Sequence, residues 1–429
     1  DATKSIIHGN NATFTTIPAS SSYDLAAYAC NNNKKPTFTN NNTLTISNIT
    51  ENISCTVEYH KSAVKELLEK VGTDSSQPIS LSQAATATTP SLTEYRYMGK
   101  DPKNYIDLGY WNSTLTGYTS NSFLISQYRI IGIFYTEDEN GNYNYRLKAT
   151  RDFAQSTQSG SSNGEPTYST LAISWNTSSS SINSGYGSNQ WGPSGSYQGS
   201  AMMKLLNPGY SSESVGGSIW WPDGTIQGKC YNGHNNASTN CSFYENFMLY
   251  PDYIDTVKWY LGATAYQIDT PTAYKQERGT TVGYADTGQT ITKTNTWIGK
   301  VGLPYESDYG YASSTCYKDR TVLYWTNGVD YRQTKCTNTN WIYRTGESVS
   351  TWLMTPDIGG PQLSSGSSYP KGAWVKQISK GGATSGRVPS TAQYFRPTFY
   401  LKPEVMFDYE ESTNTGTNSK SDVYKVTDI

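Results

Sequence analysis

The sequence predicts a mainly β protein with an α+β part, made of a small N-terminal β-sandwich and a large domain with long loops. Short β-type runs separated by Asn-rich turns fill the first 60 residues, which is typical of a small immunoglobulin-like sandwich. One run with helical periodicity follows, and the remaining chain mixes short strand-like runs with loops rich in Gly, Ser and Tyr. We therefore expect a β-sandwich at 1–60, a helix and linker at 61–93, and the large domain at 94–429.

Five β-type runs define the small domain, at 12–17, 23–30, 37–39, 43–49 and 54–59. Leu44 and Ile46 alternate with Thr and Ser, and this period of two predicts a half-buried strand. Cys30 and Cys55 each lie at a strand end, where a disulfide would hold two strands together.

The clearest predicted helix follows the small domain. Ser62 is a favourable N-cap residue, and apolar residues at positions 64, 67, 68 and 71 recur with helical spacing before Gly72. The next stretch, 73–93, is rich in Ser, Thr and Ala, contains two prolines and lacks periodicity. We predict that this stretch links the two domains.

The large domain shows several strand-like runs and two helix-like runs. Strands are expected at 128–135, 143–150, 171–175, 351–354, 372–377 and 396–401. Helices are expected at 199–206 and 253–261, because each run is followed by a Gly or by Asn-Pro-Gly. Few helices, many short strands and long loops are the reason for expecting an α+β arrangement here.

The six cysteines form three close-spaced pairs without a Cys-x-x-Cys motif or a histidine cluster, and this spacing favours disulfides over a metal site. Sequential pairing closes the shortest loops, and it gives Cys30 with Cys55, Cys230 with Cys241 and Cys316 with Cys336. Each bridge is expected to stabilise the fold by ~2–4 kcal/mol. Disulfides persist outside the reducing cytosol, so we expect an extracellular or cell-surface protein. The alternative is six buried free thiols in a cytosolic protein.

The polarity of the chain comes mainly from neutral side chains. Charged residues make up only 16% of the sequence, the net charge is -2, and no Lys/Arg stripe is present, so nucleic-acid binding is disfavoured. No apolar run approaches about 18 residues, so we expect no membrane-spanning helix in this sequence.

The sequence carries no motif for catalysis, a metal or a cofactor. His8, His60 and His234 are isolated, and no nucleophile elbow, zinc motif or P-loop occurs. The carboxylates Asp223, Glu306, Asp308 and Asp357 lie beside aromatic residues, as in some glycosidases. With 35 acidic residues such neighbours arise by chance, so we do not predict an enzyme.

Seven strings in the large domain occur together in a recognisable order. They are YRYMGKDPKNY (95–105), YRIIGIF (128–134), MKLLNPGY (203–210), KVGLPYESDYGYA (300–312), NWIY (340–343), WLMTP (352–356) and FRPTFYLK (395–402). The series resembles a family of secreted or membrane-tethered, partly pilin-like surface proteins of gut Firmicutes and Mollicutes-related bacteria. The two closing strings are similar to those of C-type-lectin-like domains related to the formylglycine-generating enzyme. The resemblance implies a C-type-lectin-like fold that displays a binding surface on its loops.

The copper chemistry of the formylglycine-generating enzymes is not carried over, because Cys316 and Cys336 look paired and precede the closing strings. The ligand motifs of calcium-dependent lectins are also absent, since only Glu165-Pro166-Thr167 comes near them. We therefore expect no cofactor.

Aromatic loop residues are the better candidates for a ligand or partner surface. We single out Tyr186, Trp191, Tyr197 and Trp374. The apolar run Val423, Tyr424 and Val426 near the end can add a strand to a neighbouring subunit, or it can close the sheet of its own domain.

The expected function is that of an extracellular structural subunit of a bacterial filament or pilus-like assembly, with further copies of the chain as partners. Tyr-, Asn- and Thr-rich neutral surfaces, disulfides and the lack of catalytic motifs favour it. The alternative is a surface adhesin that binds glycan or a host protein. A carbohydrate-active extracellular enzyme is the third hypothesis.

Overall fold

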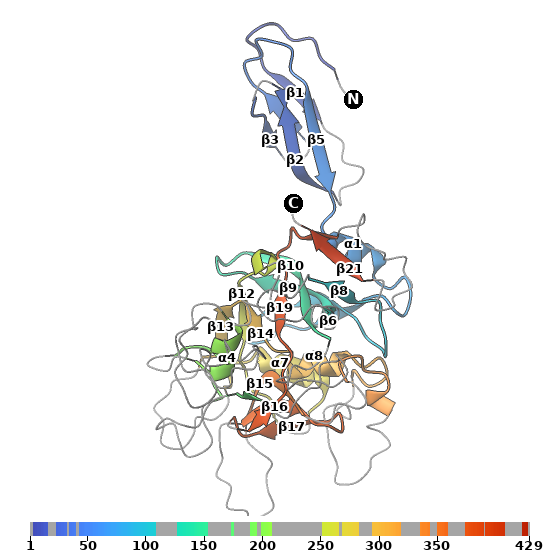
Figure 1. Ribbon diagram of the computed structural model, residues 1–429, viewed down its shortest axis with the longest axis vertical. Coiled ribbons are helices and arrows are strands. Elements are labelled where there is room, and N and C mark those ends of the chain that lie inside the picture. Colours follow the sequence, from blue (N-terminus) through green and yellow to red (C-terminus); the bar gives the residue numbers. More distant parts are fainter. Residues whose placement is uncertain are drawn as a thin grey trace, which may run out of the picture.

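The computed structural model describes residues 3–15, 23–31, 34–39, 43–108, 127–152, 173–175, 189–194, 199–207, 251–265, 268–282, 294–318, 335–343, 350–358, 374–389, 391–407 and 423–427. The chain is mainly β with few helices, as the sequence predicts. A small domain projects from one end of a much larger one (Figure 1). The strand β21 (Tyr424–Thr427) lies near the place where the two domains meet.

The small domain consists of two antiparallel sheets. In the first, β1 (Ala12–Thr15), β4 (Thr43–Ile46) and β3 (Thr37–Thr39) are ordered β1-β4-β3, and in the second β2 (Asp24–Cys30) pairs with β5 (Cys55–His60). Leu44 and Ile46 are buried, as their alternation predicts. Cys30 and Cys55 are partners in the β2–β5 register and form a disulfide, so the second sheet is closed covalently.

A short hinge joins the small domain to the first helix. The strand β5 ends at His60, and α1 (Ala63–Lys70) begins three residues later. The Ser62 hydroxyl accepts a hydrogen bond from the Lys65 amide, and Gly72 adopts a φ of 69° just after the helix, where a side chain would be strained. The predicted helix is therefore confirmed at both ends.

The prediction of a linker at 73–93 is wrong. This stretch contains β6 (Ile79–Gln83), which pairs over its whole length with β7 (Leu92–Arg96). Because β7 also pairs with the long strand β9, the stretch belongs to the large sheet. Ile79 and Leu81 alternate with Ser residues, which is a strand pattern of period two. The pattern is short, and the flanking prolines favoured a linker instead.

A nine-stranded sheet organises the large domain. Its central hairpin is β9 (Gln127–Glu137) and β10 (Tyr143–Arg151), and the path runs β14-β19-β10-β9-β8-β21-β20, with the β6–β7 hairpin attached to β9. The other strands of this path are β8 (Tyr105–Asp107), β14 (Val301–Gly302), β19 (Thr398–Tyr400) and β20 (Met406–Phe407). The sheet therefore combines segments from both ends of the domain sequence.

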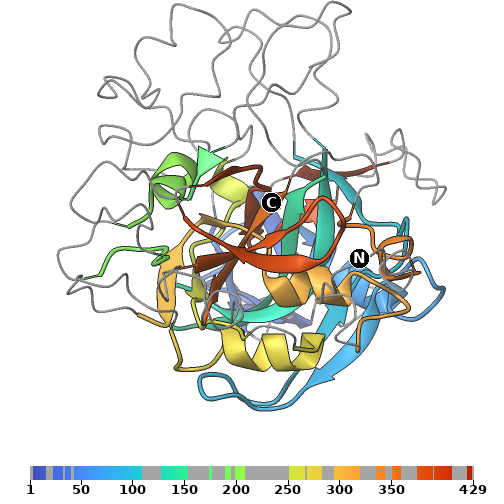
Figure 2. The ribbon, with the colours of Figure 1, turned by 90° about the horizontal axis from the view of Figure 1, so that it is seen from below.

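Smaller sheets complete the described part of the large domain, and the first of them lies toward the end opposite the small domain (Figure 1). They are β15 (Thr351–Asp357) with β16 (Trp374–Ile378) and β17 (Thr384–Arg387), β12 (Val257–Tyr260) with β13 (Thr296–Gly299), and β11 (Ile173–Ser174) with β18 (Ala392–Gln393). Figure 2 shows this end of the molecule, where α7 (Thr270–Glu277) and α8 (Glu306–Tyr311) pack on each other. A further helix, α4 (Ala201–Leu206), confirms the helix expected at 199–206.

The helix expected at 253–261 is wrong. A 3₁₀ turn at Pro251–Tyr253 leads into the strand β12, in which Val257 and Trp259 are buried and Lys258 is only half-buried. The β-branched and aromatic residues of this run fit a strand better than a helix, and pairing with β13 decides the conformation.

The core of the large domain is rich in indoles. Trp175, Trp191, Trp259 and Trp352 are fully buried. The predicted disulfide between Cys316 and Cys336 is present, whereas Cys230 and Cys241 lie outside the described residues. Within the described ranges, no helix is long and apolar enough to cross a membrane.

Candidate functional site

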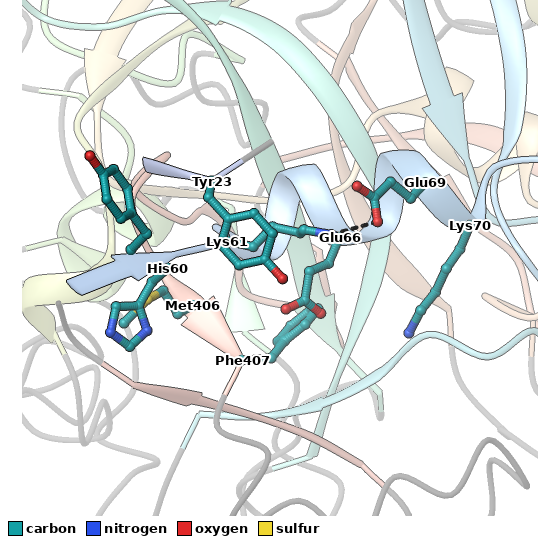
Figure 3. Close-up of a pocket in the computed structure, with 9 residues that line it drawn as sticks. Tyr23, His60, Lys61, Glu66, Glu69, Lys70, Met406 and Phe407 are labelled. Atoms are coloured by element: carbon teal, nitrogen blue, oxygen red, sulfur yellow. Dashed lines mark hydrogen bonds and ion pairs between the residues drawn. The ribbon is translucent and has the colours of Figure 1, made fainter. Parts of the chain in front are cut away.

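A cavity of about 420 Å³ lies where the small domain meets the large one (Figure 3). We call it the junction pocket. Three groups of residues line it: Tyr23, Tyr59 and His60 of the small domain; Lys61, Glu66, Glu69 and Lys70 of the hinge and α1; and Met406 and Phe407 of β20. Residues from the first and last parts of the chain thus share one cavity.

The hinge and the last hairpin fix the position of α1 in the pocket wall. The amide of Ala63, the first residue of α1, donates a hydrogen bond of 2.8 Å to the carbonyl of Val405. The strand β20 follows directly and pairs with β21. One hydrogen bond therefore joins the start of the helix to the segment that supplies the apolar wall.

Lys61 is neutralised within the pocket wall. Its Nζ lies 2.6 Å from Oε2 of the half-exposed Glu69 and 5.1 Å from the centre of the Tyr23 ring. The hydrogen bond to Glu69 raises the pKa of Lys61. The charge of Lys61 is thus already balanced before any ligand enters.

Glu66 and Lys70 stand four residues apart on α1, a spacing at which an ion pair commonly forms. No ion pair joins them here, although both are described residues, and Figure 3 shows their side chains extending separately from the helix. Lys70 instead donates a hydrogen bond of 3.2 Å to the Tyr424 hydroxyl. The Oε2 atom of Glu66 is buried and, among the described residues, has no hydrogen-bond partner.

Burial shifts the pKa of each group in the direction that favours its neutral form. It raises the pKa of Glu66 to about 7, against a smaller opposing effect of Lys70, and it lowers the pKa of Lys70. The pocket thus contains one acidic and one basic group that are partly desolvated and not in contact.

The apolar wall is held by the C-terminal strands. Phe407 stacks on Tyr424, with ring centres 4.3 Å apart and planes inclined by 15°. Tyr424 and Val426 are buried, and β21 pairs in parallel with β8 and antiparallel with β20. Of the two alternatives for Val423, Tyr424 and Val426, the structure therefore has the second, in which the segment completes the sheet of its own domain.

The predicted ligand surface is not exposed at Trp191. That side chain is fully buried, with its ring centre 4.9 Å from that of Trp175 and 6.1 Å from that of Trp297. The prediction that Trp191 contributes to a ligand or partner surface is wrong, because its indole fills the core of the large domain. Trp374 is half-buried, and its carbonyl accepts a hydrogen bond of 2.7 Å from Asn189. Tyr186 and Tyr197 lie outside the described residues.

Nine charged side chains from the large sheet, the helices α7 and α8 and the strands β15 and β16 form a buried group, and none is more than 4% exposed. We call them the buried ion cluster: Glu94, Arg96, Lys148, Glu277, Arg278, Glu306, Asp308, Asp357 and Lys376. They include three of the four carboxylates that the sequence singled out, while Asp223 lies outside the described residues.

Asp308 of α8 connects Arg96 of β7 with Lys148 of β10. Its two carboxylate oxygens lie 2.9 Å from Nη1 of Arg96 and 2.5 Å from Nζ of Lys148. Although burial alone would raise the pKa of Asp308, Lys148 and Arg96 together hold it below its usual value. Burial lowers the pKa of Lys148 to about 8, against the opposing effect of Asp308.

The cluster continues to the β15–β16 strands through hydroxyl groups. The Thr355 hydroxyl donates to Glu277 at 2.9 Å and accepts from the Glu306 amide at 2.9 Å. Lys376 Nζ lies 3.3 Å from Asp357 and 4.0 Å from Glu306. Because these carboxylates are shielded from solvent, we interpret the cluster as a structural link between sheet and helices.

No family model matches the chain, and neither a curated protein nor a solved structure was found to be similar to it. Within the described ranges, no group of three or more His, Cys, Asp or Glu side chains is arranged to hold a metal ion.

Sequence reasoning did not find the junction pocket. Glu66 and Lys70 lie within the helix that the sequence predicts, and no sequence signal connects them to Met406 and Phe407. His60, which is isolated from other histidines in the sequence, is the last residue of β5, and its side chain is 47% exposed.

Proposed function

We propose that this chain is an extracellular structural subunit of a bacterial surface filament, in which the small domain makes contacts between copies. The large domain is then the C-type-lectin-like body that each subunit displays. The two disulfides support an extracellular location, because such bonds persist in oxidising surroundings.

The edges of the small domain carry the proposal. In the described residues β1 and β3 are the outer strands of their sheet, and their sequences ATFT and TFT contain neither a charge nor a proline. Soluble proteins commonly protect outer strands with charges, prolines or covering segments, because unprotected strands pair with other chains. The small domain projects from the large one, so the large domain does not cover these edges (Figure 1). Lys4 donates a hydrogen bond to the Thr13 carbonyl of β1, so β3 is the less protected of the two strands.

In this proposal the edges of the small domain make the contact between subunits. The segment 423–426 does not donate a strand to a neighbour, since it is already part of the sheet of its own domain. A contact between different edges of successive copies would be heterologous, and contacts of that kind generate open filaments when the rotation does not close.

Electron microscopy of the full chain at micromolar concentration, with or without negative stain, tests the proposal. We expect filaments from the parent protein and none from the double variant Thr15→Lys/Thr39→Lys, which places charges at exposed positions of β1 and β3. The matched control is Ser80→Lys, which charges the exposed face of β6 in the large domain and should leave filaments intact. Monodisperse parent protein, together with bacterial surfaces that lack filaments containing the chain, would overturn the proposal.

A further inference from the structure

The junction pocket has features of a ligand site that filament formation does not require. Glu66 Oε2 is buried without a partner among the described residues, and Lys70 is directed to Tyr424 although it stands at ion-pair spacing from Glu66. A buried polar atom without a hydrogen bond destabilises the folded chain. A ligand that supplies the missing donor would remove that cost.

Charge complementarity defines the ligand. Once Lys61 and Glu69 are paired, the pocket offers one carboxylate and one ammonium that do not touch each other. A ligand that carries an ammonium for Glu66 and a carboxylate for Lys70 matches both, and it brings no net charge into the cavity. Charge-assisted hydrogen bonds are the strongest polar contacts available to such a ligand.

The remaining walls favour an apolar body. Phe407, Met406 and Tyr59 supply two aromatic rings and a thioether, and the volume of about 420 Å³ exceeds that of one large side chain. The half-exposed side chains of His60 and Glu69 connect the cavity to solvent, so a small ligand can enter.

We propose that the junction pocket binds a zwitterionic amino acid, or a short peptide with both charges, through Glu66 and Lys70, with its apolar side chain against Phe407 and Met406. The inference goes beyond the proposed filament role and does not depend on it. Binding at the hinge between His60 and Ala63 would contact the small domain and the large domain at once.

Isothermal titration calorimetry of the full chain with L-phenylalanine tests the site. N-acetyl-L-phenylalanine lacks the ammonium and L-phenylalaninamide lacks the carboxylate, so each should bind about tenfold or more weakly than the parent ligand. Glucose serves as a neutral hydroxylated probe and should not bind. Because the pKa of Glu66 is near 7, binding of the ammonium near pH 7 should release protons from Glu66, whereas Lys70, whose pKa is lowered by burial, should take up protons as it binds the carboxylate. Titration of Lys70→Met in two buffers with different ionisation enthalpies isolates the release from Glu66.

Variants assign each charge of the ligand to a residue. Glu66→Gln should remove the preference for the free ammonium, and Lys70→Met should remove the preference for the free carboxylate. Glu139→Gln, an exposed change in the β9–β10 turn, should leave all affinities unchanged.

Three results would overturn the proposal: no binding of L-phenylalanine up to about 10 mM, binding that Glu66→Gln leaves unchanged, or preferential binding of glucose. Filaments are scored separately by microscopy, so failure of one proposal does not affect the other.

Discussion

The small domain and the large domain place their charges differently, although both are rich in neutral polar residues. In the small domain, Lys34 donates to the Asn48 carbonyl at the surface, and the buried apolar side chains of its described residues include Ala12, Leu44 and Ile46. In the large domain, the core contains the nine charged side chains of the buried ion cluster. Burying an ion is costly unless many partners surround it, so only the larger core can contain such a cluster. The described residues of the small domain contain no such cluster, and a disulfide links its strands β2 and β5.

The largest expected effect is in the buried ion cluster. Asp308→Ala should lower the free energy of unfolding by about 3–5 kcal/mol, because Lys148 and half of the Arg96 guanidinium lose their carboxylate partner inside the core. Chemical denaturation followed by tryptophan fluorescence measures this loss.

Two further variants serve as controls for Asp308→Ala. Glu69→Ala removes a half-exposed partner of Lys61 and should destabilise the fold far less than Asp308→Ala, because solvent screens this pair. The double variant Asp308→Leu/Lys148→Met removes both charges and should be more stable than Asp308→Ala. Equal losses for Asp308→Ala and Glu69→Ala would show that the buried cluster does not stabilise the large domain.

The next largest effect is the loss of stability when either disulfide is removed. Cys30 and Cys55 are 25 residues apart and Cys316 and Cys336 are 20 apart, so loop closure predicts similar stabilisation of about 2–4 kcal/mol for each. Cys30→Ser/Cys55→Ser should therefore destabilise the small domain alone, and Cys316→Ser/Cys336→Ser the large domain alone.

Limited proteolysis with mass spectrometry, run across a temperature series, assigns each loss to a domain. If removal of the Cys30–Cys55 bridge accelerated cleavage in both domains equally, the two domains would not be independent folding units.

The third effect depends on pH. Burial raises the pKa of Glu277 to about 7, so the folded state favours its neutral form. The stability that this protonation contributes is complete below the ordinary glutamate pKa and is lost as the pH rises through about 7. Glu277→Gln removes the titration, so the free energy of unfolding of the parent should fall relative to the variant by on the order of 1–3 kcal/mol between pH 5 and 8.5.

Urea denaturation of both proteins at the two pH values gives this difference directly. Comparison with Glu277→Gln cancels the contributions of Lys148 and Asp308, whose pKa values are also shifted. A difference that stays constant with pH would mean that Glu277 is ionised throughout.

The smallest effect concerns Glu66, whose pKa is also raised to about 7. Because its side chain is only partly buried, solvent screening limits the effect of Glu66→Gln to less than about 1 kcal/mol. The sign is the same as for Glu277, so the variant should gain stability over the parent as the pH rises from 5 to 8. Differential scanning calorimetry at both pH values measures it, and a larger shift than for Glu277→Gln would contradict the role of burial.

Local sequence signals were reliable where the structure is local. The β-type runs of the small domain and the helix capped by Ser62 depend on nearby residues, and both were predicted close to their actual bounds. The cysteine pairs at 30 and 55 and at 316 and 336 were also found, because each bridge closes a short loop.

Predictions failed where distant segments decide the conformation. Residues 253–261 are followed by Gly262, which is typical of a helix end, but pairing with β13 makes 257–260 a strand. Trp191 is surrounded by Gly and Ser in sequence, but it is buried against Trp175 and Trp297. The short helix α8 contains Gly310 and has no helical periodicity, and its place is fixed by the ion pairs of Asp308.

The sequence by itself determined the mainly β class, the small N-terminal domain, its helix boundary and the short-range disulfides, because spacing along the chain carries those signals. Only the tertiary structure decided that Asp308 lies between Arg96 and Lys148, and that Glu66 and Phe407 share a cavity. Those contacts join residues more than 150 positions apart, so their energies depend on burial and on partners that no local pattern encodes.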